Sequence, residues 1–192
     1  MLRPNYPIET ERLLLRPLRT DDLEAFHAIH AFADVVRYLY FDSPTLDVAR
    51  GMLKKRACHV EIQREGDKLL LALELRGGGG EMIGDVSLTW LSEEHKQGEI
   101  GFALHPDQQG RGLAREAAEA MLHLGFVDLG LHRILGRLDA RNAASANVLE
   151  RLGMRREAHI LENEFVKGEW TDELLYAMLA REWIAREPIE SR

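Results

Sequence analysis

The sequence predicts an α+β protein (mixed α/β) with a mostly antiparallel central sheet and helices on both faces. Strand-like and helix-like hydrophobic periodicities follow one another in the order β, α, α, β, β, β, α, β, α, β, β. Glycine-marked turns join several neighbouring strands directly, as in antiparallel hairpins. With 192 residues, the chain is most simply one domain, residues 1–192, which is large enough to bury its own core.

The first elements are a strand and two helices. Residues 13–18 read as a strand, and the acidic pair at 21–22 favours the start of a helix over 23–32. Thr45 is a good cap for a second helix, expected over 45–65. This part of the chain therefore predicts a β, α, α beginning.

A three-stranded meander follows. Residues 68–75 and 81–91 form a hairpin across the glycine-rich connection 76–80, and 98–104 continues the sheet. The preceding loop, 38–44, carries three aromatic rings. Such rings either line a pocket or cover an edge of the core.

The last part of the chain alternates helix and strand before a final hairpin. A helix is expected over 111–127, a strand over 132–138, and a short helix after Asn142, which is a good N-cap. Two further strands, 155–166 and 169–179, are separated by a glycine turn.

Composition excludes several classes of function. A formal net charge of -7 and a pI near 5.6 argue against a sequence-independent nucleic-acid binder, which is usually basic. An acidic surface suits a cationic amine or a basic peptide, although it serves solubility equally well. The start of the chain lacks the apolar core of a signal peptide, and no apolar run approaches the roughly 20 residues of a membrane helix. We therefore expect a cytoplasmic protein without a membrane partner.

The cysteine and histidines point away from thiol and metal chemistry. Cys58 is the single cysteine, so no disulfide can form within the chain. It lies in the expected second helix, where the adjacent His59 does not share its face, which favours a structural role. The histidines show no metal-ligand spacing, so no metal is expected.

The most informative stretch is 105–117, where the strand over 98–104 ends and the helix over 111–127 begins. A glycine turn at a helix N-terminus leaves N–H groups unpaired, and these groups with the helix dipole attract phosphate or pyrophosphate. The spacing fits neither a P-loop nor a dinucleotide fingerprint, which would need glycine or alanine where Arg115 stands. The alternative is an ordinary turn before an amphipathic helix.

Two internal motifs carry a family resemblance. Gln109-x-x-Gly112-x-Ala114 resembles the pyrophosphate-binding signature of the GCN5-related N-acetyltransferase (GNAT) family. Residues 139–154 resemble the Asn-x-x-Ser…Glu-x-x-Gly-Phe segment of the same family, with Met154 in place of Phe.

The ends of the chain extend this resemblance. Residues 9–18 resemble the T-x-R-L-x-L-R-x-L opening of the RimJ/RimL-like branch, and 170–183 resembles the end of the family's domain. The core of the domain is therefore expected over about 10–183. The resemblance implies the GNAT fold, whose central sheet is splayed open between its fourth and fifth strands to admit pantetheine.

The resemblance also implies how acetyl-CoA binds. The turn would hold the pyrophosphate, the preceding strand would pair with the pantetheine amides, the Asn side chain would bond the pantetheine arm, and the Ser would lie near the sulfur. The residues that match are Phe102, Ala103, Leu104, Gln109, Gly110, Arg111, Gly112, Leu113, Ala114, Asn142 and Ser145.

Three residues are candidates for catalysis. Glu99 shares the small-chained face of its strand with Gly101 and Ala103, opposite an apolar face. Glu164 matches the position of the base in RimL-like enzymes and is favoured slightly over Glu99. Ser145 is the candidate proton donor to the leaving thiolate, although a helix-start hydroxyl can instead bond a backbone N–H.

The expected function is transfer of an acetyl group from acetyl-CoA to a primary amine by direct attack in a ternary complex. The acceptor is a protein N-terminal amine or a small amine such as a polyamine, an amino acid or an aminoglycoside. The alternative is a non-catalytic, CoA-binding regulatory protein. A monomer and a homodimer are both open, since Trp183 and Ile184 could pack in a dimer or close the sheet of one chain.

Overall fold

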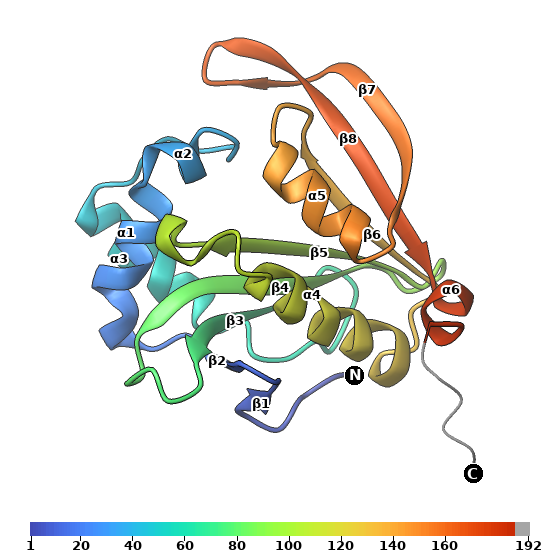
Figure 1. The fold of residues 1–192 in the computed structure, drawn as a ribbon, viewed down its shortest axis with the longest axis horizontal. Helices are drawn as coiled ribbons and strands as arrows, with labels where there is room; N and C mark the ends of the chain where they lie inside the picture. The colour runs from blue at the N-terminus through green and yellow to red at the C-terminus, as the bar shows by residue number, and fades with distance from the viewer. Residues whose placement is uncertain (187–192) are drawn as a thin grey trace.

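The computed structural model describes residues 1–186, and residues 187–192 of the expected domain lie outside that part. Within it, an eight-stranded sheet runs in the order β1-β2-β3-β4-β5-β6-β8-β7 (Figure 1). Every neighbouring pair is antiparallel except β5 and β6, which are parallel. Helices lie on both faces, so the predicted fold class is confirmed.

The described elements have the following bounds. The strands are β1 (Ile8–Glu9), β2 (Leu13–Pro17), β3 (Lys68–Leu75), β4 (Met82–Ser92), β5 (Gln97–Leu104), β6 (Arg133–Asp139), β7 (Arg155–Val166) and β8 (Glu169–Leu179). The helices are α1 (Leu23–Ala31), α2 (Ala33–Val36), α3 (Leu46–Arg56), α4 (Leu113–His123), α5 (Ala143–Arg151) and α6 (Ala180–Ile184). Short 3₁₀ turns span Thr20–Asp22 and Pro106–Gln108.

The sheet opens between β5 and β6. Their parallel pairing covers only Gln97↔Arg133, Gly98↔Ile134 and Glu99↔Leu135, although β5 continues to Leu104. Beyond Glu99 the two strands separate, and the edge of β5 that faces β6 has no strand partner. These are the fourth and fifth of the strands predicted from sequence, so the expected splay is confirmed.

Two apolar cores hold helices against opposite faces of the first half of the sheet. Alternate residues of β3 divide between them: Leu71 joins the core under α4, whereas Ala72 joins the core under α1 and α3. The same alternation on β5 sends Ile100 toward α4 and Ala103 toward α1 and α3. We call the side of the sheet that carries Ala103 the acceptor face.

The expected helix over 45–65 is wrong in its second half. Thr45 does cap it, with its Oγ1 accepting from the Val48 amide at 3.4 Å, but α3 ends at Arg56. Ile62 instead pairs with Leu2 through two backbone hydrogen bonds of 2.7 and 2.8 Å. Cys58 therefore lies outside the helix and is exposed.

Other boundaries differ at helix ends. The expected helix over 111–127 begins at Leu113 and continues after His123 as a π-helical turn, Leu124–Asp128. Trp183 of α6 is buried and its ring stacks on Phe126 at 6.1 Å, so this side chain packs within its own chain.

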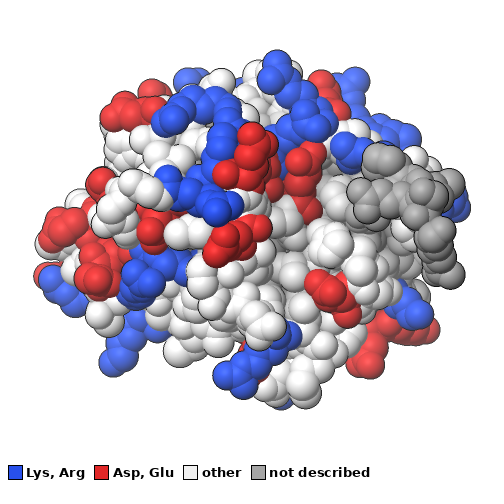
Figure 2. All heavy atoms as spheres, turned by 60° about the horizontal axis from the view of Figure 1, so that its bottom comes forward, with Lys and Arg blue, Asp and Glu red and all other residues white. Residues whose placement is uncertain are grey.

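The surface is mixed in charge on the face drawn in Figure 2, where basic and acidic side chains are interspersed. In the described part of the chain, no helix is both long and apolar enough to cross a membrane.

Candidate active site

A groove of about 550 Å³ opens between the end of β5, the first turn of α4, and α5. Nearly all the positions expected to contact acetyl-CoA line it: Phe102, Ala103, Leu104, Gln109, Gly110, Gly112, Leu113, Ala114, Asn142 and Ser145. Arg111 does not line it, because its carbonyl accepts a hydrogen bond from Arg12 and its guanidinium donates to Gln108. Segments from three elements thus converge on one groove.

Two glycines shape the turn that leads into α4. Gly110 and Gly112 have φ of 72° and 79°, in the left-handed region that residues with a Cβ avoid. Gly112 is the N-cap of α4, and its carbonyl accepts the helix's first backbone bond from the Glu116 amide at 3.1 Å. The backbone amides of residues 110–112 donate no hydrogen bond within the helix, so the turn suits an anionic pyrophosphate.

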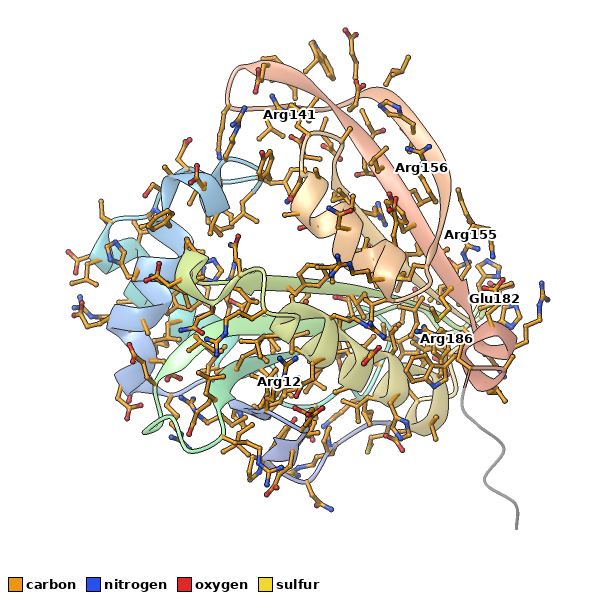
Figure 3. The ribbon with its side chains drawn as sticks, viewed as in Figure 1. Arg12, Arg141, Arg155, Arg156, Glu182 and Arg186 are labelled. Carbon is orange, nitrogen blue, oxygen red and sulfur yellow. The ribbon has the colours of Figure 1, made fainter. Side chains whose placement is uncertain are left out.

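The N-terminal segment that carries Thr10 and Arg12 holds this turn in place. Arg12 donates from Nη1 to the Arg111 carbonyl at 2.8 Å and from Nε to Glu116 at 2.7 Å (Figure 3). The Thr10 hydroxyl also donates to Glu116, at 2.6 Å. Burial raises the pKa of Glu116, but the hydrogen bonds from Thr10 and Arg12 outweigh it and leave the pKa lowered. Thr10 and Arg12 therefore act on the groove from a segment far away in sequence, which sequence reasoning missed.

A second cavity of about 430 Å³ lies on the acceptor face, where β5 and β6 separate. Gly101 of β5 and Gly136 of β6 are among its lining residues. The two cavities meet, because both are lined by Tyr38, Leu39, Phe102, Ala103, Asn142 and Ser145. The aromatic loop over 38–44 therefore lines a pocket, which was one of its two expected roles.

Asn142 and Ser145 stand where the cavities meet. Asn142 is the N-cap of α5, and its Oδ1 accepts from the Ser145 amide at 3.0 Å. The cap uses only the side-chain carbonyl, so the Asn142 amide group is left to bond a ligand. The Ser145 hydroxyl has no hydrogen-bond partner among residues 1–186, so it does not serve the backbone N–H expected in the alternative.

Comparison with known proteins identifies the family. The acetyltransferase (GNAT) domain family matches residues 12–155. The chain belongs to the GNAT acetyltransferase family. The uncharacterized N-acetyltransferase YnaD of Bacillus subtilis (strain 168) is 31% identical, over 92% of this chain and 98% of that protein. The spermidine N(1)-acetyltransferase of Escherichia coli (strain K12) is 25% identical, over 89% of this chain and 88% of its own.

A solved structure agrees. The crystal structure of a GNAT-family acetyltransferase from Bacillus anthracis superposes with a TM-score of 0.80 and 32% identity, covering 91% of this chain and 99% of that chain. The expected family is confirmed, and with it the activity: this GNAT protein is an N-acetyltransferase that uses acetyl-CoA and an amine. Within residues 1–186, no cluster of three or more His, Cys, Asp and Glu side chains could hold a metal ion.

The two candidate bases of the acetyltransferase lie on different strands, Glu99 on β5 and Glu164 on the edge strand β7. Glu99 sits at the last β5–β6 pair, and its Oε2 forms an ion pair with Arg137 Nε at 3.1 Å. Glu164 lies on β7 opposite Thr171 of β8, and among the described residues its carboxylate forms no ion pair. Neither residue lines the two cavities, but both act electrostatically on Tyr40, which does.

Glu173 is a third carboxylate at this place, and sequence reasoning missed it. It lies on β8 opposite Asp139 and is 4% exposed. Burial raises its pKa, Arg137 lowers it, and the charges of Glu164 and Glu99 raise it again, so that the pKa is raised overall. Burial and the same carboxylates raise the pKa of Tyr40 to about 12. The available signal was an acid directly before the apolar run over 174–179.

A buried polar pair lies on the same face, toward β3 and β4, and was also missed. His30 Nε2 and Asp85 Oδ2 are 2.7 Å apart, and both residues line the acceptor cavity. Burial raises the pKa of Asp85, but the charge and hydrogen bond of His30, with the charges of Arg56 and Lys68, outweigh it and leave the pKa lowered. The signal was one charged residue inside the apolar strand over 81–91.

Proposed function

We propose that the cavity on the acceptor face binds a small primary amine and that Glu164 takes the proton from it. One observation carries the proposal: the groove and this cavity meet at the gap between β5 and β6, where both are lined by Phe102, Ala103 and Ser145. An acetyl donor in the groove and an amine in the cavity would meet there. Holding two reactants in contact supplies much of the rate in such a transfer.

On the donor side, three parts of the chain have separate tasks. The turn over 109–114 would hold the pyrophosphate, the free edge of β5 would pair with the pantetheine amides, and the amide of Asn142 would bond the same arm. When bound, acetyl-CoA supplies an acetyl group activated as a thioester. A backbone N–H on the β5 edge would stabilise the charge that grows on the carbonyl oxygen, an effect worth roughly 3 kcal/mol.

On the acceptor side, the amine must be uncharged before it attacks. Its unperturbed pKa is about 8 for an α-amine and about 10.4 for a lysine amine, so a base is needed at neutral pH. The ion pairing supports Glu164 over Glu99, because the oxygens of Glu99 are already engaged by Arg137 whereas those of Glu164 are free of ion pairs within the described residues. Glu99 then serves to position Arg137.

Ser145 would return a proton to the leaving thiolate. Ser145 lines both cavities, and its hydroxyl has no hydrogen-bond partner among the described residues, so it is available for this role. The size of the acceptor cavity, about 430 Å³, favours a small molecule over an extended peptide. The similarity to a spermidine N(1)-acetyltransferase also supports a small amine.

Release of the CoA thiol tests this proposal. Wild type, Glu164→Gln and Glu99→Gln are compared on basic N-terminal peptides, polyamines, amino acids and aminoglycosides, with Glu162→Gln as an exposed control on the same strand. We expect turnover on a small amine, a loss in kcat of about 100-fold or more in Glu164→Gln, and less than about tenfold in the other variants. Full activity of Glu164→Gln would refute its role as base. Turnover confined to the N-terminal peptides would refute a small amine as the acceptor.

A further inference from the structure

We propose that the part of the acceptor cavity over β3 and β4 is an anion-binding subsite, and that the acceptor is therefore a small amine that also carries a carboxylate. This inference rests on the proposed function, since it takes the same cavity as the acceptor site. It adds the chemical class of the acceptor, and it predicts an acceptor different from a polyamine.

Two cations in this part of the cavity lack a carboxylate partner. Arg56, at the end of α3, and Lys68, at the start of β3, both line the cavity, and neither forms an ion pair with a residue in 1–186. The other charged pairs in the lining are satisfied elsewhere: Arg137 binds Glu99, and Asp139 binds Arg141 at 2.7 Å. An anion is the ligand that two such cations favour.

Asp85 acts electrostatically on both cations, but it carries one charge against their two and forms an ion pair with neither. It is the acid on this side of the cavity, and its direct partner is His30, at 2.7 Å. The imidazole Nδ1 of His30 is buried and has no hydrogen-bond partner, which is costly unless a ligand or water bonds it. A buried, unpartnered polar atom in a wall that already holds two cations is a second sign of a missing polar ligand.

The guanidinium of Arg56 is fixed in place. Its Cζ lies 5.3 Å from the centre of the Phe26 ring and 5.9 Å from that of Phe41, within the range of cation–π contact. Its Nη1 is also 3.4 Å from His30 Nε2. A guanidinium held against two aromatic rings presents its N–H groups without losing much conformational freedom, which suits recognition of a carboxylate.

The acceptor face is therefore polarised across the gap. Near the gap, the charges of Glu99, Glu164 and Arg137 act on Glu173, so acids outnumber the cation there. On the side of β3 and β4, the cations Arg56 and Lys68 outnumber the acid Asp85. An amine that carries a carboxylate matches both ends. A polyamine would bring a second ammonium against the two cations, and such like-charge contact selects against it.

Ligand pairs that differ only by the carboxylate test this inference. The values of kcat/KM for acetylation are compared for β-alanine against ethylamine, 4-aminobutyrate against propylamine, and a set of α-amino acids against their decarboxylated amines, with spermidine added. We expect at least one carboxylate-bearing member to exceed its partner and spermidine by tenfold or more. In Arg56→Gln and Lys68→Gln its KM should rise at least tenfold, with the KM for acetyl-CoA unchanged.

Matched controls lie on the same helix. Arg50→Gln and Lys54→Gln remove exposed cations from α3 and should leave every KM within about twofold. If plain amines or spermidine react as well as the carboxylate-bearing acceptors, or if Arg56→Gln and Lys68→Gln leave KM unchanged, the inference is overturned while the proposed function stands.

A binding measurement needs no turnover, and it separates failure of the anion-binding subsite from failure of the proposed function. Calorimetry on the CoA-loaded protein compares the N-acetyl products of the same amino-carboxylates with the matching N-alkylacetamides. Binding of an acetylated carboxylate at least tenfold tighter, lost in Arg56→Gln, supports the subsite even if no acceptor is turned over. Equal binding, or no binding of either ligand, overturns it.

Discussion

Glu99 and Arg137 form an ion pair of 3.1 Å at the point where β5 and β6 part. The pair stands beside the gap through which the two cavities meet. Within the described residues, Glu164 and Glu173 form no ion pair, so Glu99 is the one acid of the three that is paired with a cation. The charge of Arg137 also lowers the pKa of Glu173, and it partly opposes burial and the other two carboxylates, which leave that pKa raised overall. Several consequences of this account can be measured.

Removing Arg137 should shift the pH dependence of acetylation. A nearby cation favours the ionised form of a carboxylate, so loss of Arg137 raises the pKa of Glu173. In Arg137→Gln the acid limb of the kcat/KM profile should therefore move to higher pH. Arg156 lies on β7 and forms no ion pair in the described part of the chain. Arg156→Gln therefore serves as the control, and no shift is expected in it. An unmoved or downward-shifted limb in Arg137→Gln would contradict the account.

Glu173 should lower stability at neutral pH. Because its pKa is raised in the folded state, the folded protein holds the proton more tightly than the unfolded chain does. The resulting destabilisation is absent below the unfolded pKa of about 4.3 and is complete above the raised folded pKa. The difference in Tm between Glu173→Gln and wild type should therefore grow in favour of the variant from pH 4 to pH 8. Exposed Glu94→Gln should show no such trend, and a pH-independent difference for Glu173→Gln would be evidence against the raised pKa.

Gly112→Ala should weaken acetyl-CoA binding beyond its cost in stability. An alanine at φ 79° costs about 1–2 kcal/mol, and its Cβ would lie 3.5 Å from Arg12 Nη2. The matched control is Gly66→Ala, at φ 89° with nothing within 4 Å of its Cβ. Both variants should lose similar stability, but only Gly112→Ala should raise the Kd for CoA, by about tenfold. Equal Kd values in the two variants would show that the turn does not hold the ligand.

Arg16 should be essential to the fold. Its guanidinium is 4% exposed and binds Asp22 at 2.7 Å and Glu74 at 2.9 Å. Removing one member of a buried ion pair leaves an uncompensated charge and costs about 3–5 kcal/mol. Denaturant unfolding of Arg16→Met should show a loss of this size, against less than about 1 kcal/mol for Arg50→Met. A small loss in Arg16→Met would mean that Asp22 and Glu74 find other partners.

Local signals made the cofactor groove predictable from sequence. The turn over 109–114 is specified by its glycines and by the helix that follows, and Asn142 is specified by its cap, so each could be read within a few residues. The alternation of side chains along β5 likewise assigns Ile100 and Ala103 to opposite faces, because successive residues of a strand point to opposite sides of the sheet.

Pairing between distant segments was not predictable in the same way. The contact of His30 with Asp85 joins α1 to β4, and that of Arg12 with Glu116 joins the residue before β2 to α4. Neither has a sequence period that could reveal it. The helix expected over 45–65 was too long for the same reason, since pairing of Ile62 with Leu2 overrides local helix propensity.

Amide hydrogen exchange with and without CoA tests the central claim most directly, because it reports where the ligand lies. The β5 edge beyond Glu99 lacks a strand partner, and the first amides of α4 lack helical partners, so both should exchange quickly in the free protein. The account predicts that CoA slows exchange in peptides that cover 100–104 and 110–116, with little change in α3. Unchanged exchange in both segments at saturating CoA would contradict it.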